Sequence, residues 1–504
     1  KNCQKVCGLM RAVELLQAVR YEPAGEKIRF PDREISGVSI DSRDCREGSV
    51  FVCIRGSVCN GSRYAKEAVR HGAKVLVAAK EEQELIGKIL GQFSECEGVL
   101  VEDEREAAAL LAARYEGEPS RSMMMIGVTG TKGKTTTVSM IRKILSEAGI
   151  RTGMIGTTGQ FDGKEHLPSE HTTPDAVTLQ RSLARMRKNA CRACVMEVSS
   201  QALKLQRTKG ICFDTGVFLN LGDDHIGRFE HADKEEYQAC KRKLFLQSRE
   251  AVVNADDPAW KQMLAGTGCP FQTFGIRNGD FRAVKIRTES FVQGHPGVEF
   301  DIGKVHFQIP APGIFTVYNA LAAVRVCMQY GVTPKTAAGS LLDFQVKGRM
   351  QFFSIPGGGE AVIDYAHNAM SLESVLTTLR AYRPARLITV FGCGGQRAKE
   401  RRFQMGEVSG RLSDLTVITS DNPRWEAPEA IMDDIETGVR KTDGKYLRIT
   451  DRKEAVKQAV EMAGPGDLVV IAGKGHENTQ EIQGVFYRMD EQELVEEACT
   501  QKLL

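Results

Sequence analysis

The sequence lacks any long apolar run. No stretch of its 504 residues approaches the roughly 18 consecutive apolar residues of a membrane-spanning helix, so we expect no span and a cytoplasmic location. A strong excess of one charge is also missing, because 68 basic residues face 65 acidic ones and leave a net charge of +3. This balance argues against a nucleic-acid-binding protein.

The cysteines do not form a disulfide or zinc pattern. Fourteen of them are spread along a long chain, which is typical of buried or free thiols. Cys191 and Cys194 form one C-x-x-C pair, but no second pair follows at zinc-ribbon spacing. The length suffices for about three domains that each bury a core.

Residues 123–137 predict a strand, a glycine-containing loop and a helix. The loop glycines let backbone N–H groups turn toward a phosphate, Lys134 can reach the β- and γ-phosphates, and the Thr135 hydroxyl can bind Mg²⁺. The common G-x-x-x-x-G-K-[ST] pattern is incomplete, since Val128 stands at its first glycine. We therefore predict a nucleoside triphosphate site built on a shorter loop.

Polar side chains also follow two further apolar segments. Residues 193–200 are typical of a strand with polar residues at its end, among them Glu197, and an Asp-Asp-His cluster containing His225 follows residues 216–221. Open α/β sheets bind ligands at the carboxyl ends of their strands, and carboxylates with an imidazole suit Mg²⁺. Taken alone, His225 is as well explained as a capping or core histidine. Beside Glu197 and a phosphate loop it favours a metal site.

Strand-like and helix-like segments alternate along the chain and predict three α/β domains. We expect a small N-terminal α/β domain at 1–118, because glycine and proline punctuate the polar residues 116–120. A central domain with a P-loop ATPase-like, doubly wound sheet should span 119–346. A Rossmann-like α/β domain should span 347–504, and its expected strands are 361–364, 387–391, 415–420 and 467–472.

The loop Gly-Thr-Lys-Gly-Lys-Thr at 130–135 resembles that of the Mur ligase and folylpolyglutamate synthetase superfamily, whose members join a carboxylate to an amine with ATP. Further motifs follow the order of MurE-type ligases, namely Thr172–Asp175, Met196–Ser200, Asp224–His225, Asp364–His367, Phe391–Gly395, Thr419–Arg424 and Ala472–Glu477. The resemblance implies a peptidoglycan-precursor ligase that acts through an acyl phosphate on UDP-N-acetylmuramoyl-L-alanyl-D-glutamate. A folylpolyglutamate-type ligase should lack the N-terminal domain and Asp-Asn-Pro-Arg.

The resemblance also implies roles for matching positions. Catalytic roles fall to Lys134, Lys241, His225 and Arg349. ATP would contact Gly130, Thr131, Lys132, Gly133, Lys134, Thr135, Thr136, Asn319, Arg349 and Asp364, with His367 nearby. Mg²⁺ would be held by Thr135, Glu197, His225 and Lys241. The UDP-sugar would contact Ser42, Thr172, Thr173, Ser199 and Arg207. The amino acid would contact Arg397, Asp421, Asn422, Pro423, Arg424, Gly473 and Glu477.

The expected helix at 234–245 carries a lysine of special interest. A solvated basic face is the plain explanation. The resemblance implies instead that Lys241, rather than Lys243, is carbamylated by CO₂ and then binds a second Mg²⁺. Carbamylation needs an amine that can lose its proton, which partial burial and nearby cations favour.

The Asp-Asn-Pro-Arg motif implies meso-diaminopimelate as the amino acid. An arginine fork can bind the second carboxylate of diaminopimelate through two parallel hydrogen bonds, and Glu477 can meet its distal ammonium. L-lysine or another diamino acid stays an alternative, as does a ligand-binding paralogue without turnover. Both alternatives rest on departures from the family pattern, which include Gln201, Thr316, Gln351 and Gln396. We expect a monomer.

Overall fold

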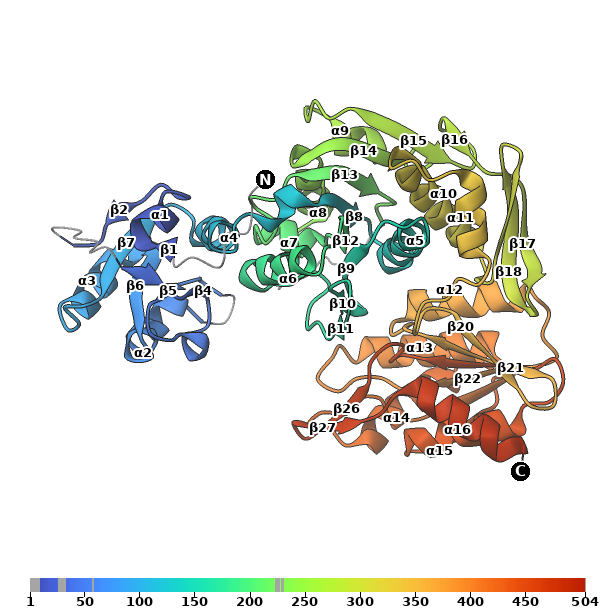
Figure 1. The fold of residues 1–504 in the computed structure, drawn as a ribbon. Helices are drawn as coiled ribbons and strands as arrows, with labels where there is room; N and C mark the ends of the chain where they lie inside the picture. The colour runs from blue at the N-terminus through green and yellow to red at the C-terminus, as the bar shows by residue number, and fades with distance from the viewer. Residues whose placement is uncertain (1–9, 26–32, 57–58, 223–226, 228–230, 504) are drawn as a thin grey trace. The chain divides into compact units, whose positions relative to one another are not determined.

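The computed structural model describes residues 10–25, 33–56, 59–222, 227 and 231–503. The chain packs into two compact units, one made of residues 1–282 with 321–332 and the other of 283–320 with 333–504. Figure 1 follows the chain from blue at the N-terminus to red at the C-terminus. None of the helices in the described part of the chain combines the length and apolar content of a membrane-spanning segment.

The N-terminal part of the first unit is built on a five-stranded sheet. Its strands, in spatial order, are β2 (Glu22–Pro23), β7 (Glu97–Val101), β6 (Ala73–Ala79), β5 (Ser49–Val52) and β4 (Gly37–Ser39). The last four are parallel. Its helices include α2 (Ala65–Arg70), α3 (Gln83–Leu90) and α4 (Glu104–Tyr115). Val50 and Phe51 are neighbours on β5 but belong to different cores, so both faces of the sheet are covered.

A nine-stranded sheet forms the rest of the first unit. Its order is β11 (His166–Leu167), β10 (Gly159–Phe161), β9 (Thr152–Gly156), β12 (Ala193–Glu197), β8 (Met124–Thr129), β13 (Phe213–Phe218), β14 (Ser248–Asn254), β15 (Phe271–Gly275) and β16 (Phe281–Arg282). Val128 of β8 pairs with Glu197 of β12, and Thr129 pairs with Phe218 of β13. These three central strands therefore end at the same level, and the segments that follow them share one edge of the sheet.

Helices pack on this sheet, and the sequence predicted two of them, the one after the phosphate loop and the one at 234–245. They are α5 (Lys134–Glu147), α6 (Ala176–Lys188), α7 (Ser200–Lys204), α8 (Lys234–Leu246) and α9 (Trp260–Leu264). Leu179 of α6, Leu203 of α7, Leu244 of α8 and Met263 of α9 belong to one core with Met125 of β8. The apolar residues of four helices thus anchor them on a single face of the sheet.

The second unit begins with an antiparallel sheet that the sequence did not predict. Its strands are β17 (Val284–Val292), β18 (His295–Ile302) and β19 (Val305–Ile309). The helices α10 (Ile314–Gln329) and α11 (Pro334–Leu341) follow, and α10 crosses the division between the two units at residue 320.

The second unit continues as a doubly wound sheet. Its order is β20 (Gln351–Ile355), β21 (Gly359–Asp364), β25 (Leu468–Ala472), β22 (Leu387–Phe391), β23 (Leu415–Ile418) and β24 (Tyr446–Arg448), and all but β20 are parallel. Its helices are α12 (Ala369–Arg380), α13 (Glu400–Leu412), α14 (Pro428–Val439), α15 (Arg452–Met462) and α16 (Glu491–Leu503). Leu372, Met405 and Ile435 cover one face, while Val456 and Val495 cover the other. The Rossmann-like prediction is confirmed.

Candidate active site

The predicted phosphate loop joins β8 to α5. Gly133 precedes the first helical residue with φ of 86°, a backbone conformation that glycine adopts without a steric cost. The Lys134 Nζ donates to the carbonyl oxygens of Gly130 at 2.8 Å and of Thr131 at 3.0 Å. The amino end of α5 and an ammonium group therefore face the same loop, which suits a polyphosphate.

Asn220, two residues after β13, fixes this loop from the side. Its Oδ1 accepts from the backbone N–H groups of Thr131 at 3.1 Å and Lys132 at 2.9 Å, and its Nδ2 donates to the Lys132 carbonyl at 3.1 Å. The sequence analysis missed this residue. One signal could have identified it: an asparagine two residues after an apolar strand, at the edge of the sheet where ligands bind.

Glu197 links the phosphate loop to its surroundings. The side chain is 1% exposed, and its Oε1 accepts from the Thr135 hydroxyl at 3.0 Å and from the Thr157 N–H at 2.7 Å. Gly156 leaves the necessary space, because a Cβ there would lie 2.4 Å from the same oxygen. Two of the predicted Mg²⁺ ligands, Thr135 and Glu197, are thus in contact.

Lys241 lies on α8 and is 1% exposed, whereas Lys243 is exposed. The Lys241 Nζ donates to the Gly130 carbonyl at 3.0 Å and lies 4.3 Å from the centre of the Tyr237 ring. The structure therefore brings the predicted lysine, and not its neighbour, to the phosphate loop. His225, the remaining predicted metal ligand, falls outside the described residues.

Four of the five residues predicted to contact the UDP-sugar lie close to Glu197, namely Thr172, Thr173, Ser199 and Arg207. The Thr172 and Thr157 hydroxyls are 3.0 Å apart, and the Thr173 hydroxyl donates to the Glu197 carbonyl at 2.8 Å. The same Thr173 hydroxyl accepts from the backbone N–H of Ser199 at 3.1 Å. Thr173 is thereby held between β12 and α7.

Arg207 and Ser42 complete the predicted UDP-sugar set. The Arg207 Nη1 donates to the Thr173 carbonyl at 2.6 Å, and burial lowers the pKa of its guanidinium. Ser42 belongs to the N-terminal sheet region, where its hydroxyl donates to Glu67 at 3.0 Å and follows a capping Asp41. Hydrogen bonds therefore hold Arg207 beside Thr173 in the central sheet region and Ser42 beside Glu67 in the N-terminal sheet region.

In the second unit, Asp364 ends β21 and accepts from the Met350 N–H at 2.9 Å. Burial raises the pKa of its carboxyl, against the opposing charge of Arg349. The Arg349 guanidinium lies 4.5 Å from the centre of the Tyr365 ring.

Two further residues predicted near ATP lie elsewhere in this unit. Asn319 is buried on α10. His367 is exposed, and its ring contacts the Tyr365 carbonyl at 2.9 Å.

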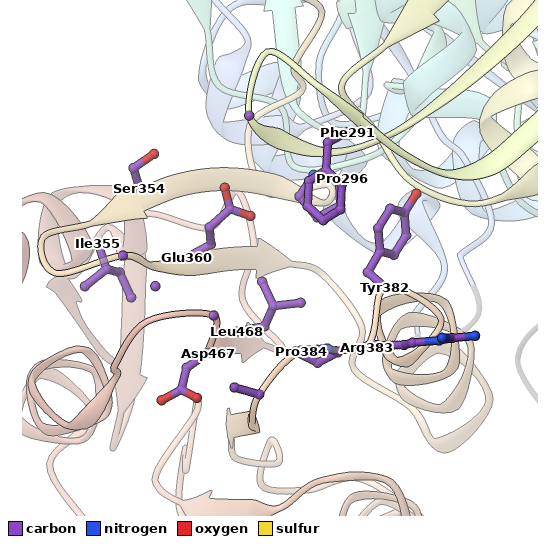
Figure 2. Close-up of a pocket in the computed structure, with 15 residues that line it drawn as sticks. Phe291, Pro296, Ser354, Ile355, Glu360, Tyr382, Arg383, Pro384, Asp467 and Leu468 are labelled. Atoms are coloured by element: carbon purple, nitrogen blue, oxygen red, sulfur yellow. The ribbon is translucent and has the colours of Figure 1, made fainter.

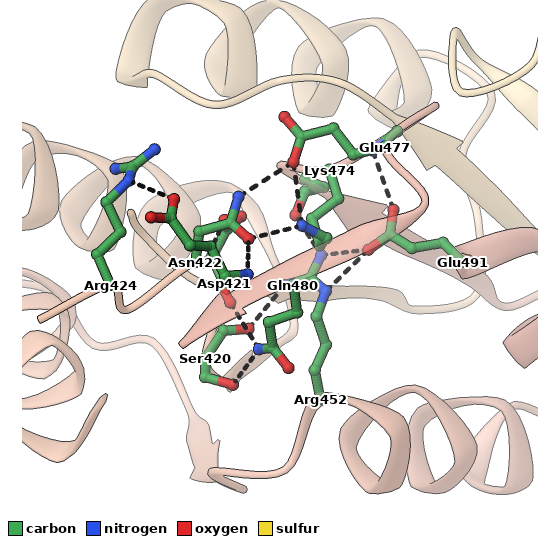
Figure 3. Close-up of polar contacts among 12 residues, drawn as sticks. Ser420, Asp421, Asn422, Arg424, Arg452, Lys474, Glu477, Gln480 and Glu491 are labelled. Atoms are coloured by element: carbon green, nitrogen blue, oxygen red, sulfur yellow. Dashed lines mark hydrogen bonds and ion pairs between the residues drawn. The ribbon is translucent and has the colours of Figure 1, made fainter. Parts of the chain in front are cut away.

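The predicted amino-acid residues follow β22, β23 and β25, whose ends share one sheet edge. Asn422 donates to the Glu477 carboxylate at 3.1 Å, and Lys474 donates to Asn422 at 3.1 Å and to Glu477 at 3.0 Å (Figure 3). Burial of Glu477 opposes its ionisation, but the charge and hydrogen bond of the fully buried Lys474 outweigh it and hold the carboxyl pKa below its usual range. Asp421 and Pro423 are buried, Gly473 has φ of 118°, and Arg397 is exposed.

A buried ion pair between Arg452 and Glu491 supports these segments (Figure 3). Both side chains are 0% exposed, and the Arg452 Nε donates to Glu491 at 2.8 Å. Arg452 also donates to the Ala472 carbonyl at 2.9 Å, while Glu491 accepts from the Gly475 N–H at 3.1 Å. The sequence analysis did not identify this pair, because two charges 39 residues apart give no spacing signal.

Three departures from the family pattern have contacts of their own. The Gln351 Oε1 accepts from the Gly348 N–H at 2.9 Å, and the Thr316 hydroxyl donates to the Pro312 carbonyl at 3.0 Å. The backbone N–H of Gln396 donates to Glu426. Gln351 thus stabilises the turn that presents Arg349.

A cavity of about 580 Å³ lies at the other edge of the C-terminal sheet (Figure 2). Glu360 and Leu468 line it from the amino ends of β21 and β25, with Phe291 and Pro296 from the β17–β18 hairpin. Tyr382 closes one side, and its hydroxyl donates to the Gly297 carbonyl at 2.6 Å. None of the predicted site residues lines this cavity.

Comparisons with family models, similar proteins and solved structures all match this chain to Mur ligases. Family models match three successive stretches: "Mur ligase family, catalytic domain" at 34–116, "Mur ligase middle domain" at 128–327 and "Mur ligase, glutamate ligase domain" at 348–475. Two similar proteins, from Syntrophomonas wolfei subsp. wolfei and Chlorobaculum tepidum, are each called UDP-N-acetylmuramoyl-L-alanyl-D-glutamate--2,6-diaminopimelate ligase. The first is 37% identical over 98% of this chain and 100% of its own, the second 39% identical over 92% of both. A solved structure of a ligase with the same name has a TM-score of 0.67 at 28% identity and covers 98% of this chain and 100% of its own.

Proposed function

Because the chain belongs to the Mur ligase family, we propose that it is a MurE-type, ATP-dependent ligase that adds meso-diaminopimelate to UDP-N-acetylmuramoyl-L-alanyl-D-glutamate in peptidoglycan precursor synthesis. The observation that carries this proposal is the position of Glu197. Its carboxylate contacts Thr135 of the phosphate loop, and its backbone carbonyl contacts Thr173 of the segment assigned to the acid substrate. The nucleotide and the carboxylate to be activated would therefore meet at one residue.

The reaction requires activation, because a carboxylate oxygen is a poor leaving group in water. In the proposed sequence, an oxygen of the D-glutamate carboxylate forms a bond to the γ-phosphorus of ATP while the bond to the bridging oxygen breaks and releases ADP. The amine of diaminopimelate then attacks the carbonyl carbon of this acyl phosphate, inorganic phosphate leaves, and the nitrogen loses a proton. The protein's part is to position the reactants and neutralise charge.

The chain's own residues fit these tasks. Lys134 can exchange its contacts with the Gly130 and Thr131 carbonyls for phosphate oxygens, and the amino end of α5 adds N–H groups. Arg349, stacked on Tyr365, would neutralise charge on the transferring group. Asn319 and Asp364 would contact the adenosine part.

The donor set around Glu197 fits Mg²⁺, because the Thr135 hydroxyl and the Glu197 carboxylate are hard oxygen ligands only 3.0 Å apart. We infer that these two residues, His225 and a carbamylated Lys241 would hold the metal. When bound, Mg²⁺ would neutralise charge on the phosphate oxygens. The Lys241 amine would become a carbamate by adding CO₂ and losing a proton, and its buried position beside Gly130 would bring the new oxygens to the phosphate loop.

For the amino acid, we infer that Arg424 binds the second carboxylate of diaminopimelate and that Glu477 binds the distal ammonium. The low pKa of Glu477 supports this assignment, because the carboxylate stays ionised wherever the ammonium is present. The domain limits 1–118, 119–346 and 347–504, the monomeric state and the cytoplasmic location remain predictions.

ADP release tests the proposal. The assay combines UDP-N-acetylmuramoyl-L-alanyl-D-glutamate with meso-diaminopimelate, L-lysine or L-ornithine, and the Lys134→Ala variant is the inactive control. We expect turnover with diaminopimelate alone. Preference for lysine would overturn the assignment of Arg424, and the absence of turnover with all three acceptors would overturn the ligase activity.

A further inference from the structure

Arg424 is held by hydrogen bonds to Glu481, four residues after Glu477, and to Gly395. Its Nε donates to the Glu481 carboxylate at 3.0 Å, and its Nη1 donates to the Gly395 carbonyl at 2.6 Å. Glu481 belongs to β26 (Thr479–Ile482), which pairs with β27 (Val485–Arg488) in a short hairpin. The Arg424 and Glu481 side chains are only 21% and 23% exposed. The guanidinium is therefore fixed in direction as well as in place.

The backbone reinforces this arrangement. The Arg424 N–H donates to the Glu481 carbonyl at 3.1 Å, and the Gln483 N–H donates to the Arg424 carbonyl at 2.7 Å. The Glu481 N–H donates in turn to the Asn422 side chain at 2.9 Å. Arg424 itself has φ of 55°, a sparsely populated conformation for a residue with a side chain, which these contacts hold in place.

A guanidinium has five N–H donors arranged in a plane. The hydrogen bonds to Glu481 and Gly395 involve Nε and Nη1, so further N–H groups on Nη1 and Nη2 can serve a ligand. Gly394 allows this close packing, because a Cβ at that position would lie 3.3 Å from the Arg424 Nη1. The Glu481 carboxylate thus occupies one edge of the guanidinium, and the Nη1–Nη2 edge is suited to a second carboxylate.

We propose that Glu481 is a positioning residue for acceptor selection: it holds the Arg424 guanidinium so that its remaining fork receives the second carboxylate of a diamino dicarboxylic acid. This inference rests on the proposed function. It adds a residue that does not touch the substrate and acts through Arg424. An acceptor without that carboxylate, such as L-lysine, gains nothing from Glu481.

A double-mutant cycle tests the proposal, with KM for meso-diaminopimelate measured in the wild type, Glu481→Ala, Arg424→Ala and the double variant. In Glu481→Ala the guanidinium loses its Nε partner and spends less time in the competent direction. If that population falls to about a tenth, KM for diaminopimelate rises about tenfold. KM for ATP and for the UDP-sugar should not change. In the Arg424→Ala background the second substitution should have no effect on KM for diaminopimelate.

Glu481→Gln separates orientation from charge. Its amide oxygen can still accept from the Arg424 Nε, so we expect a KM within about threefold of the wild type. Glu373→Ala is the matched control, because it removes the partner of Arg411 in an exposed ion pair of the same domain and should leave every KM unchanged.

Two results would overturn the proposal. If Glu481→Ala lowers KM for diaminopimelate, Glu481 competes with the substrate instead of positioning Arg424. If its effect is the same with and without Arg424, the two residues act independently. A different result marks failure of the proposed acceptor: Arg424→Ala would then leave KM for diaminopimelate unchanged while ADP release continues.

Discussion

Replacing Asn220 by alanine should weaken ATP binding without removing any group that touches ATP. The substitution removes three side-chain hydrogen bonds to the phosphate loop, but the Thr131 N–H keeps its bond to the Asn220 backbone carbonyl at 3.0 Å. Two bonds to Lys132 are therefore lost outright. At about 1 kcal/mol each, the ordered loop loses about 2 kcal/mol, which corresponds to roughly a 30-fold rise in the Kd for ATP.

Titration calorimetry with ATP measures this effect, and KM for ATP in the ADP-release assay should follow it. Asn220→Asp keeps the acceptor oxygen but places a negative charge beside the phosphates, so it should also weaken ATP binding while retaining more of the loop's order. Asn254→Ala is the matched control, because the Asn254 Nδ2 donates to the Leu219 carbonyl at 2.9 Å and does not reach the loop. An unchanged Kd in Asn220→Ala would refute the view that the loop is organised before ATP binds.

Three further predictions follow from the same contacts. Glu197→Gln should lower kcat by about 100-fold, since the amide oxygen can still accept from the Thr135 hydroxyl but lacks the negative charge of the proposed Mg²⁺ ligand, while circular dichroism should show an intact fold. Glu491→Ala should lower the free energy of unfolding by about 3–5 kcal/mol in urea titrations, because it leaves the fully buried Arg452 unpaired, and a loss below 1 kcal/mol would contradict this account. The pKa of Glu477 is lowered in the folded state, so its ionised form contributes stability above the ordinary pKa of 4.5 that is lost as the pH falls through the folded value. The wild type should therefore lose more stability than Glu477→Gln on acidification below pH 4.5, as followed by thermal melting, and identical pH profiles would contradict it.

The sequence predicted the elements whose signals are local. Apolar runs ending in polar residues identified β8, β12, β21, β22, β23 and β25, and the glycine loop identified the start of α5, but the short parallel strand β24 was not predicted. Lys241 could be distinguished from Lys243 by resemblance, and its burial on α8 is consistent with that choice. The strands and the helix start were predictable because strand ends and helix starts are determined by neighbouring residues, whereas the role of Lys241 stays a prediction.

Interactions between distant residues were not predictable in the same way. Asn220 contacts Lys132 across 88 positions, and Arg452 contacts Glu491 across 39. Nothing in the sequence around Glu481 indicates its contact with Arg424, which forms because β26 places the two side chains together. The sheet β17–β19 was missed because the sequence analysis relied on apolar runs, although β17 and β19 carry the alternating pattern of half-exposed strands. Such contacts depend on the register of strands, which no single segment determines.

The two ammonium groups at the phosphate loop have a consequence for how a nucleotide enters. Lys134 and Lys241 both donate to the Gly130 carbonyl, at 2.8 and 3.0 Å, so a backbone oxygen of the loop solvates both cations. Arrival of a triphosphate is then an exchange reaction, in which Lys134 leaves one set of oxygens for another. Conversion of Lys241 to a carbamate would remove one donor from that carbonyl and replace a cation with an anion. The net charge beside the phosphate loop would thus depend on dissolved CO₂.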